Sequence, residues 1–407
     1  MKHHCRICKK TLDYNLVNLR SSPLSNAYLK ASDLARAEVH YPLQVFVCES
    51  CFLVQLPEYE SPEDIFHDYA YFSSFSDSWL AHAKTYVEQM ISQGHVNSNS
   101  FVIELASNDG YLLQYFLERD IAVLGIEPAD NVAEVARKKG IDTLSEFFGT
   151  TLAKQLKEKG QTADLLAANN VLAHVPDIND FVAGVSLVLN PDGVATFEFP
   201  HLLELMSQRQ FDTIYHEHFS YLSLISLMGL FKAQGLEIFN VEKLPTHGGS
   251  LRVYVSHLGA KPIQASVASV LDKEHEFGLH QIESYVAFSK EILSLKYQIL
   301  DFFTQARKEG KSVVGYGAPA KGNTLINYCG LDSDSIQYVV DRNTHKQGMF
   351  LPGSQIPIHA PQEIEATQPD YLVIMPWNLT TEISKQMEVI RSWGGRFVTF
   401  IPEVRIF

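Results

Sequence analysis

Two imidazoles, a carboxylate and two phenols lie within seven residues of this chain, from Tyr215 to Tyr221. Histidine titrates near neutral pH and can accept a proton, while a nearby carboxylate or phenol can fix its tautomer or stabilise a developing oxyanion. The stretch is therefore a candidate for proton-transfer chemistry. Two other interpretations remain open: a solvated loop, and half of a metal site formed by His216 and His218.

The cysteines indicate a metal centre near the N-terminus. Four of the five form two Cys-x-x-Cys pairs, Cys5/Cys8 and Cys48/Cys51. Four thiolates match the tetrahedral shell of a structural zinc ion. A redox role would call for a single motif at a strand–helix junction, and disulfides would call for an oxidising compartment. We therefore predict one structural zinc ion, with the fifth cysteine, Cys329, simply packed in a core.

The composition is that of a globular protein with two or three domains. Of the 407 residues, 46% are hydrophobic and 20% are charged, which predicts a chain that folds throughout. The formal net charge of −14 gives no attraction to nucleic acid or anionic lipid, so we expect neither as a partner. The N-terminus shows no signal-peptide segment, and no window approaches the ~18 apolar residues of a membrane helix. We expect a cytoplasmic protein.

Strands and helices alternate from Phe101 onward. A short apolar strand at 101–105 leads into a turn at 106–110, and a second strand at 121–126 ends in Glu127. A carboxylate at this place can accept hydrogen bonds from both ribose hydroxyls of an adenosine ligand. The turn lacks Gly-x-Gly-x-x-Gly, which argues against a pyrophosphate and favours a phosphate-free nucleoside such as S-adenosylmethionine.

Later strands of the same domain end in further polar residues. Glu146 and Phe147 follow a third short strand, where an acid and an aromatic ring could flank adenine. Asn169 and Asn170 end the fourth strand, either as groups that face a ligand or as ordinary turn residues. A fifth strand at 193–199 precedes the Tyr215–Tyr221 stretch, and a strand pair at 237–241 and 251–255 completes a seven-strand pattern.

The C-terminal third predicts a second α/β domain. Helical spacing from Ile282 to Ala306 predicts a long bridging helix with an apolar stripe. A strand, a loop of small residues and a helix follow at 312–323, and Lys321 could balance the charge of a phosphate there. Further strands at 336–340 and 371–375 would end near Asp341, Trp377 and Asn378.

With these motifs assembled, the chain resembles the sugar C-methyltransferases that methylate a ring carbon of nucleotide-linked 4-keto deoxysugars. The resemblance spans nearly the whole chain. Besides the paired cysteines, it rests on Glu-x-x-Ser-Asn-Asp-Gly at 104–110, Tyr-x-Glu-His at 215–218, His-Gly-Gly at 247–249, Gly-Tyr-Gly-Ala-x-Ala-Lys at 315–321, Lys346-Gln347 and Trp377-Asn378. Two positions are distinctive: Glu146 stands where an aspartate is common, and His216 fills the variable slot of Tyr-x-Glu-His.

The resemblance implies a fold, a reaction and a set of site residues. The expected fold is α/β, with a zinc-binding domain at 1–65, a Rossmann-like seven-strand methyltransferase domain at 66–260, bridging helices at 261–310 and a Rossmann-like nucleotide-sugar domain at 311–407. His218 is the expected base, assisted by Tyr215 and Glu217, with His174 as a further active-site histidine. The expected donor site comprises Glu104, Ser107, Asn108, Gly110, Glu127, Glu146, Phe147, Asn169 and Asn170. The expected acceptor site comprises Tyr69, Tyr71, Ser73, His247, Gly248, Tyr316, Ala318, Lys321, Asn323, Asp341, Trp377 and Asn378.

The expected cofactors are S-adenosylmethionine and structural zinc, and the expected acceptor is linked to a thymidine or guanosine diphosphate. We expect a monomer or a weak homodimer. One alternative is a zinc-ribbon interaction or regulatory protein with a non-catalytic Rossmann-like core. Another is an NAD-dependent enzyme acting on nucleotide-sugars, which the missing glycine fingerprint disfavours.

Overall fold

The computed structural model describes residues 3–60 and 72–407. The chain divides into two compact units, and each is assembled from three separate stretches. Unit 1 comprises Met1–Leu12, Cys48–Leu202 and Phe219–His280; unit 2 comprises Asp13–Val47, Leu203–His218 and Gln281–Phe407. The predicted acceptor residues Tyr69 and Tyr71 lie outside the described residues.

Unit 1 is built around a seven-stranded sheet of strand order β10-β11-β8-β7-β4-β5-β6, which confirms the seven-strand prediction. The strands from β8 to β6 run parallel, and β11 is antiparallel to both β8 and β10. Their bounds are β4 Phe101–Leu105, β5 Ala122–Ile126, β6 Thr143–Leu144, β7 Ala163–Asn169, β8 Leu189–Pro200, β10 Leu236–Leu244 and β11 Ser250–His257. The strand order reverses at β4 and β7, and in such sheets ligands bind outside the carboxyl ends of these two strands.

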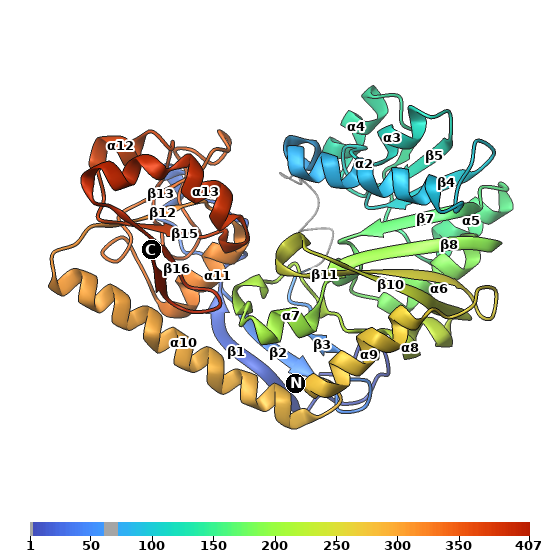
Figure 1. Cartoon of the computed structure of the whole chain (residues 1–407), viewed down its shortest axis with the longest axis horizontal. Coiled ribbons are helices and arrows are strands. Elements are labelled where there is room, and N and C mark those ends of the chain that lie inside the picture. The colour runs from blue at the N-terminus through green and yellow to red at the C-terminus, as the bar shows by residue number, and fades with distance from the viewer. Residues whose placement is uncertain (1–2, 61–71) are drawn as a thin grey trace. The chain divides into compact units, whose positions relative to one another are not determined.

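Helices cover both faces of this sheet. The helices α2, α3 and α4 lie on one face, and α6 and α8 on the other (Figure 1). The buried residues of α2, which include Ala83, Tyr86 and Met90, recur at helical spacing and join a core with Val102 of β4. The bounds are α2 Asp77–Ser92, α3 Leu113–Leu117, α4 Asp130–Lys138, α5 Thr150–Glu158, α6 Ile178–Val188, α8 Leu224–Ala233 and α9 Ala265–Phe277. A short antiparallel pair, β3 Val54–Gln55 and β9 Ser220–Tyr221, also belongs to unit 1.

Unit 2 contains a six-stranded sheet of order β14-β13-β12-β15-β16-β17, in which only β17 is antiparallel to its neighbour. The strand bounds are β12 Val313–Tyr316, β13 Val339–Val340, β14 Ile358–His359, β15 Tyr371–Ile374, β16 Arg396–Thr399 and β17 Arg405–Ile406. The helix bounds are α11 Ala320–Cys329, α12 Glu363–Thr367 and α13 Thr380–Gln386. This arrangement confirms a second Rossmann-like sheet.

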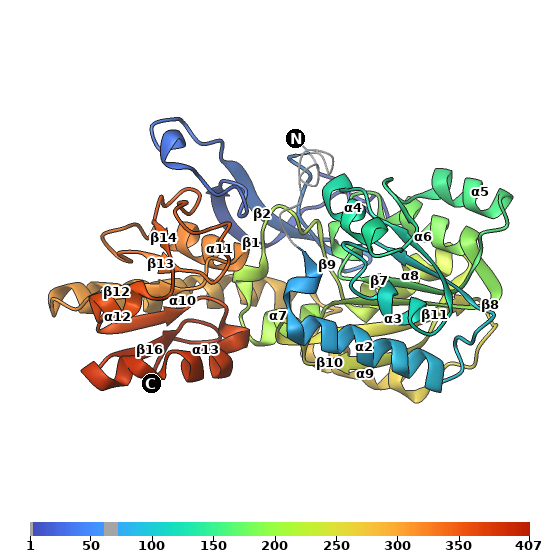
Figure 2. The same cartoon turned by 90° about the horizontal axis from the view of Figure 1, so that it is seen from above.

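The long predicted helix is α10, Ile282–Lys308. Its buried residues recur every three or four positions from Tyr285 to Ala306, as the sequence pattern indicated. The helix packs against β1, Tyr14–Ser22, which pairs antiparallel with β2, Tyr41–Val47 (Figures 1 and 2). The short helix α7, Leu202–Ser207, precedes the stretch that carries the histidine motif.

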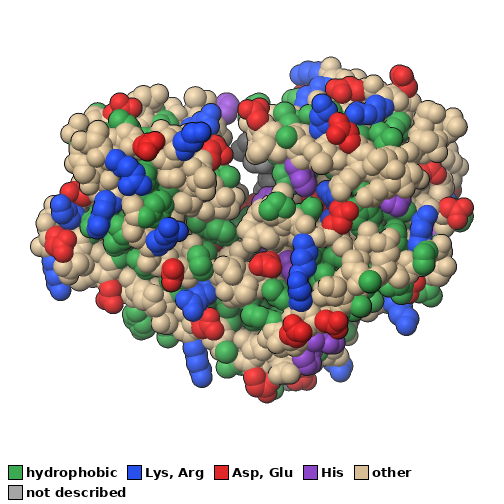
Figure 3. All heavy atoms as spheres, in the orientation of Figure 1, with side chains coloured by type: hydrophobic (Ala, Val, Ile, Leu, Met, Phe, Trp, Pro, Cys, Tyr) green, Lys and Arg blue, Asp and Glu red, His purple; other side chains and the backbone are tan. Residues whose placement is uncertain are grey.

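Charged side chains of both signs are interspersed on the face of the protein shown in Figure 3. The acidic excess is therefore not gathered into a single patch on that face. No helix within residues 3–60 and 72–407 combines the length and the apolar character needed to cross a bilayer.

Candidate active site and zinc centre

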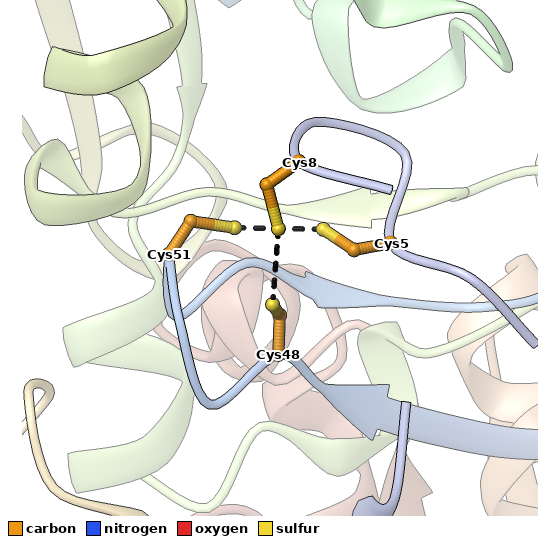
Figure 4. Close-up of side chains that lie close together, drawn as sticks. All are labelled: Cys5, Cys8, Cys48 and Cys51. Atoms are coloured by element: carbon orange, nitrogen blue, oxygen red, sulfur yellow. Dashed lines mark hydrogen bonds between the residues drawn. The ribbon is translucent and has the colours of Figure 1, made fainter. Parts of the chain in front are cut away.

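The four predicted zinc ligands come together in unit 1. Their sulfur atoms lie within 4.8 Å of one another, and all four point inward (Figure 4). The sulfurs of Cys5 and Cys51 are 3.4 Å apart, as are those of Cys8 and Cys48. Zinc–sulfur bonds of about 2.3 Å in a tetrahedron would separate the sulfurs by roughly 3.8 Å, so the arrangement fits a zinc ion. Among the described residues no such cluster includes His216 or His218.

The turn after β4 has an unusual backbone. Ala106, Asn108 and Gly110 have φ of 54°, 50° and 76°, in the left-handed region that costs energy for residues with a side chain. The amide of Asn108 donates to one carboxylate oxygen of Glu127 at 2.9 Å, and the amide of Ala129 donates to the other at 2.9 Å. A carboxylate that directly follows β5 thus holds the turn that follows β4. Burial raises the pKa of Glu127, and these two bonds oppose the rise.

A buried carboxylate lies one residue before the end of β4. Glu104 is fully buried, and neither of its carboxylate oxygens has a partner in ordinary hydrogen-bond geometry among the described residues, although the side chain of Tyr111 interacts with it. Burial raises its pKa well above the usual range, and the interaction with Tyr111 acts to lower that pKa. The Oδ1 atom of Asn169, at the end of the neighbouring strand β7, is also buried and unpartnered among them. Buried polar groups in native proteins normally have partners, so this edge suits a ligand with hydrogen-bond donors or positive charge.

A buried charge network that sequence reasoning missed extends along the same edge. His82 of α2 is 2.8 Å from Glu198 of β8, and Glu198 accepts a hydrogen bond from Arg252 of β11 at 2.7 Å. Burial raises the pKa of Glu198, but the hydrogen bond from His82 and the charge of Arg252 bring it below its usual value. The ring of Trp79 stacks on His82 at 4.9 Å and meets the edge of His247 at 5.4 Å. No short sequence motif predicts this network, because its residues come from four separate elements.

The Tyr-x-Glu-His motif at residues 215–218 lies in unit 2 and forms a tight turn. The amide of His218 donates to the carbonyl of Tyr215 at 2.9 Å, and the two rings are 4.0 Å apart. His218 Nδ1 donates to the carbonyl of Thr213 at 2.9 Å. Its neighbour His216 is only 4% exposed, with its ring against that of Tyr41, and burial lowers its pKa. The two imidazoles therefore have different surroundings.

A residue far away in sequence orients the motif carboxylate. The amide nitrogen of Asn26 donates to Glu217 at 2.6 Å, across 191 residues of sequence. Glu217 is buried, which raises its pKa, and the bond from Asn26 opposes that rise. Asn26 is thus a second residue that the sequence pattern did not indicate.

The loop after β12 in unit 2 is held in the same manner as the turn after β4 in unit 1. The amides of Ala318 and Asn343 donate to the two carboxylate oxygens of Asp341, each at 2.8 Å. The carbonyl of Ala318 accepts from Tyr28 at 2.6 Å and from Lys346 at 2.8 Å. The predicted residues Ala318 and Asp341 are therefore brought together at the carboxyl ends of β12 and β13.

Four further predicted acceptor residues make contacts inside unit 2. The ammonium of Lys321 lies 4.2 Å from the centre of the Trp377 ring and donates to Asn378. Trp377 Nε1 donates to Asp212 at 2.8 Å, which ties the C-terminal sheet to the stretch before the Tyr-x-Glu-His motif. Burial raises the pKa of Asp212 to about 6 and lowers that of Lys321 to about 8. Asn323 is buried in α11 and donates to the carbonyl of Ser25 at 2.6 Å.

The remaining predicted residues occupy varied surroundings. In unit 1 the amide of Ser73 donates to the side chain of Asn108, which places Ser73 beside the turn after β4. Asn170 has φ 55° and shows turn geometry, with its amide bonded to the carbonyl of Glu198. Glu146 and Phe147 are exposed, whereas Ser107 is buried against Gly125 and Gly110 lies against Ile141. His174 ends a 3-10 turn, and His247 and Gly248 lie in a turn of positive φ. In unit 2, the hydroxyl of Tyr316 donates to the side chain of Gln386.

These features define a class of protein. Unit 1 is a Rossmann-like domain in which the acid after the second strand accepts a hydrogen bond from the turn after the first, and that turn lacks Gly-x-Gly-x-x-Gly. It also carries a four-cysteine centre, and unit 2 has a second Rossmann-like sheet together with the Tyr-x-Glu-His motif.

Comparison with known families agrees with that class. The chain matches models of a zinc binding domain at residues 5–66, a methyltransferase domain at 87–241 and a C-methyltransferase C-terminal domain at 245–402. It is 35% identical to the C-methyltransferase NovU of Streptomyces niveus over 403 residues, covering 99% of this chain and 96% of the relative. The chain therefore belongs to the family of S-adenosylmethionine-dependent C-methyltransferases with an N-terminal zinc-binding domain. It uses S-adenosylmethionine and holds structural zinc.

Weaker similarities cover only part of the chain. The ubiquinone biosynthesis O-methyltransferase of Bartonella quintana is 29% identical over 97 residues, covering 24% of this chain and 39% of that relative. The structure of magnesium protoporphyrin IX methyltransferase from Synechocystis PCC 6803 with bound SAH aligns with 48% of this chain and 92% of that chain, at 14% identity and a TM-score of 0.36.

Proposed function

We propose that the chain transfers a methyl group to the carbon next to the ketone of a nucleotide-linked 4-keto-deoxyhexose, which yields a branched-chain sugar. The proton on that carbon is weakly acidic, so its removal needs a poised base and donors to the enolate oxygen. S-adenosylmethionine supplies an electrophilic methyl group when bound. The chain must remove the proton, stabilise the charge and hold the reactants in line.

The proposed base is His218, and the bond from its Nδ1 to Thr213 is the observation that carries this assignment. A carbonyl oxygen only accepts hydrogen bonds, so the neutral ring keeps its proton on Nδ1 and its basic lone pair on Nε2. His216 is a weaker candidate because burial lowers its pKa and thus disfavours the protonated form that a base must adopt.

Neighbouring groups take supporting roles. Tyr215, whose ring lies 4.0 Å from that of His218, is proposed to donate a hydrogen bond to the enolate oxygen. Glu217, held by Asn26, is proposed to accept a hydrogen bond from a sugar hydroxyl. His174 is proposed as a further active-site histidine on the strength of the family resemblance.

Donor and nucleotide are assigned to different units. The buried carboxylate of Glu104 suits the positively charged methionine part of the donor, and Glu127 suits its ribose. The loop that contains Ala318, with Lys321 and Asp341 beside it, suits a nucleoside diphosphate. Thymidine and guanosine diphosphates are both compatible with these groups.

The test uses a panel of nucleotide 4-ketosugars incubated with S-adenosylmethionine and read by mass spectrometry. We expect a product heavier by one methylene with at least one ketosugar. In deuterium oxide with S-adenosylhomocysteine, the acceptor carbon should exchange its proton. His218→Asn should abolish both exchange and methylation while calorimetry shows unchanged S-adenosylhomocysteine binding, and His216→Asn should retain substantial activity.

The opposite pattern would reassign the base. If His216→Asn is inactive while His218→Asn still exchanges deuterium, His216 removes the proton. If no ketosugar gains a methyl group, the proposed acceptor class is wrong, although C-methylation of another acceptor would still be consistent with the family.

A further inference from the structure

Arg6 lies between the two cysteines of the first zinc knuckle, yet its side chain is directed to three other segments of unit 1. One guanidinium nitrogen donates to the carbonyl of Pro176 at 2.9 Å, and another donates to the carbonyl of Leu56. The guanidinium carbon lies 5.0 Å from the centre of the Phe219 ring. A planar guanidinium can make several directional bonds and a ring contact at once, which suits it to fasten separate segments together.

The backbone of the knuckle is fastened to the same region. The amide of Arg6 donates to the side chain of Gln55 at 2.9 Å, and its carbonyl accepts from Asn179 at 2.7 Å. The knuckle that zinc closes is thus bonded on one side to β3 and on the other to the segment of residues 176–179. Its position depends on the metal, because so short a loop has no core of its own.

The segments that Arg6 fastens flank two proposed active-site histidines. Pro176 lies two residues after His174, and Phe219 directly follows His218. These segments also bond to each other, since the amide of Phe219 donates to the carbonyl of Ala173 at 2.8 Å. A catalytic group misplaced by about 1 Å can cost two orders of magnitude in rate.

We infer that Arg6 is a positioning residue, through which the zinc knuckle holds the chain at Ala173–Pro176 and at Phe219 in place for the reaction. The structural zinc centre then acts on the acceptor chemistry and leaves donor binding alone. The kinetic part of this inference rests on the proposed function, whereas its structural part does not.

The test is Arg6→Met, which keeps the length of the side chain and removes its donors. We expect one zinc per chain by elemental analysis and S-adenosylhomocysteine affinity within twofold of the wild type. Hydrogen exchange read by mass spectrometry should be at least tenfold faster in peptides covering residues 172–176 and 219–222, and unchanged at 101–105. Methylation should fall at least tenfold in kcat, with the KM for the donor unchanged.

Two variants separate this role from general effects. Lys10→Met removes an exposed positive charge from the same knuckle and should leave exchange and rate unchanged. Arg6→Lys keeps the charge but lacks the planar fork, and should give intermediate exchange protection. Arg6→Met with bound zinc and wild-type exchange at 172–176 would overturn the inference, and so would loss of zinc from Arg6→Met, since Arg6 would then serve the metal site itself. Because the exchange experiment needs no acceptor, it decides the inference even if every ketosugar fails.

Discussion

The two Rossmann-like sheets of this protein share the arrangement of their first two strands and the loops that follow them, and they differ in the charged residues beside these loops. In both, the first strand lies in the interior of the sheet, and an acid that follows the second strand accepts one hydrogen bond from the loop after the first strand and one from its own loop. In unit 1 that acid is Glu127, bonded to Asn108 and Ala129; in unit 2 it is Asp341, bonded to Ala318 and Asn343. The same pairing of a carboxylate with two loop amides therefore occurs twice in one chain.

The difference lies at one equivalent strand position. Glu104 pairs with Gly125 across β4 and β5, whereas Gly315 pairs with Val339 across β12 and β13. A Cβ atom at Gly315 would lie 2.7 Å from the Val339 side chain, so unit 2 has no room for a counterpart of Glu104 there. Unit 2 instead carries Lys321 at the start of α11. These charges match the proposal of a cationic donor in unit 1 and an anionic nucleotide in unit 2.

The substitution Glu104→Gln is expected to have the largest effect on ligand binding. If the carboxylate pairs with the positive charge of the donor, its loss should weaken S-adenosylmethionine binding by about 3 kcal/mol, roughly a hundredfold. Calorimetry measures the change. Because the amide is isosteric, circular dichroism should show an unchanged fold, and an unchanged affinity would refute the charge assignment.

Asp212→Asn tests the buried carboxylate of unit 2 through pH. Burial raises its pKa from 3.8 to about 6, against the charge of Lys321 and the bond from Trp377, so the folded chain holds a proton that the unfolded chain releases between these values. The free energy of unfolding of the wild type should therefore fall by up to about 3 kcal/mol as pH rises from about 4 to 6, at roughly 1.4 kcal/mol per pH unit. Above about pH 6, this contribution should no longer change with pH.

Thermal unfolding midpoints at pH 4 and pH 7 measure this dependence. The amide does not titrate, so the variant should show a flatter profile than the wild type. Identical profiles would mean that Asp212 carries its charge without cost.

Glu127→Ala and Asp341→Ala form a matched pair across the two units. Glu127→Ala should weaken donor binding by about 1.5–3 kcal/mol, the usual scale for hydrogen bonds to a charged group. Asp341→Ala removes the equivalent acid from unit 2 and should leave donor affinity unchanged. Calorimetry with S-adenosylmethionine compares them, and equal losses would show that the two acids do not serve separate ligands.

Lys321→Met should have the smallest effect. The loss of one partly screened charge opposite a diphosphate should raise the KM for the nucleotide-sugar about tenfold, or about 1.4 kcal/mol. The KM for the donor should not change. Steady-state kinetics with each substrate varied in turn would show whether the effect is confined to the nucleotide-sugar. A change in the KM for the donor alone would contradict the assignment of Lys321 to the nucleotide-sugar.

The sequence by itself determined the features that are recorded in local spacing. Two Cys-x-x-Cys pairs predicted the zinc cluster, since each pair fixes two ligands within one turn. The pattern of apolar residues predicted the strands of the unit 1 sheet, three of the six strands of unit 2 and the helix α10, because burial on one face imposes a repeat on the residues that form an element. It did not predict β14, β16 and β17. The missing glycine fingerprint and the acid Glu127 predicted a nucleoside site, because both belong to a single βαβ unit.

Contacts between residues far apart in sequence became visible only in the folded chain. Asn26 meets Glu217 across 191 residues, Trp377 meets Asp212 across 165, and Arg6 meets Pro176 across 170. The grouping of residues 13–47 with 281–407 is equally invisible in the sequence. No repeating pattern of residues in the sequence indicates such contacts, because each depends on how elements far apart along the chain pack together. For the same reason, only the family resemblance favoured His218 over His216 in the sequence, whereas the fold shows that His216 is buried and that His218 is bonded to the carbonyl of Thr213.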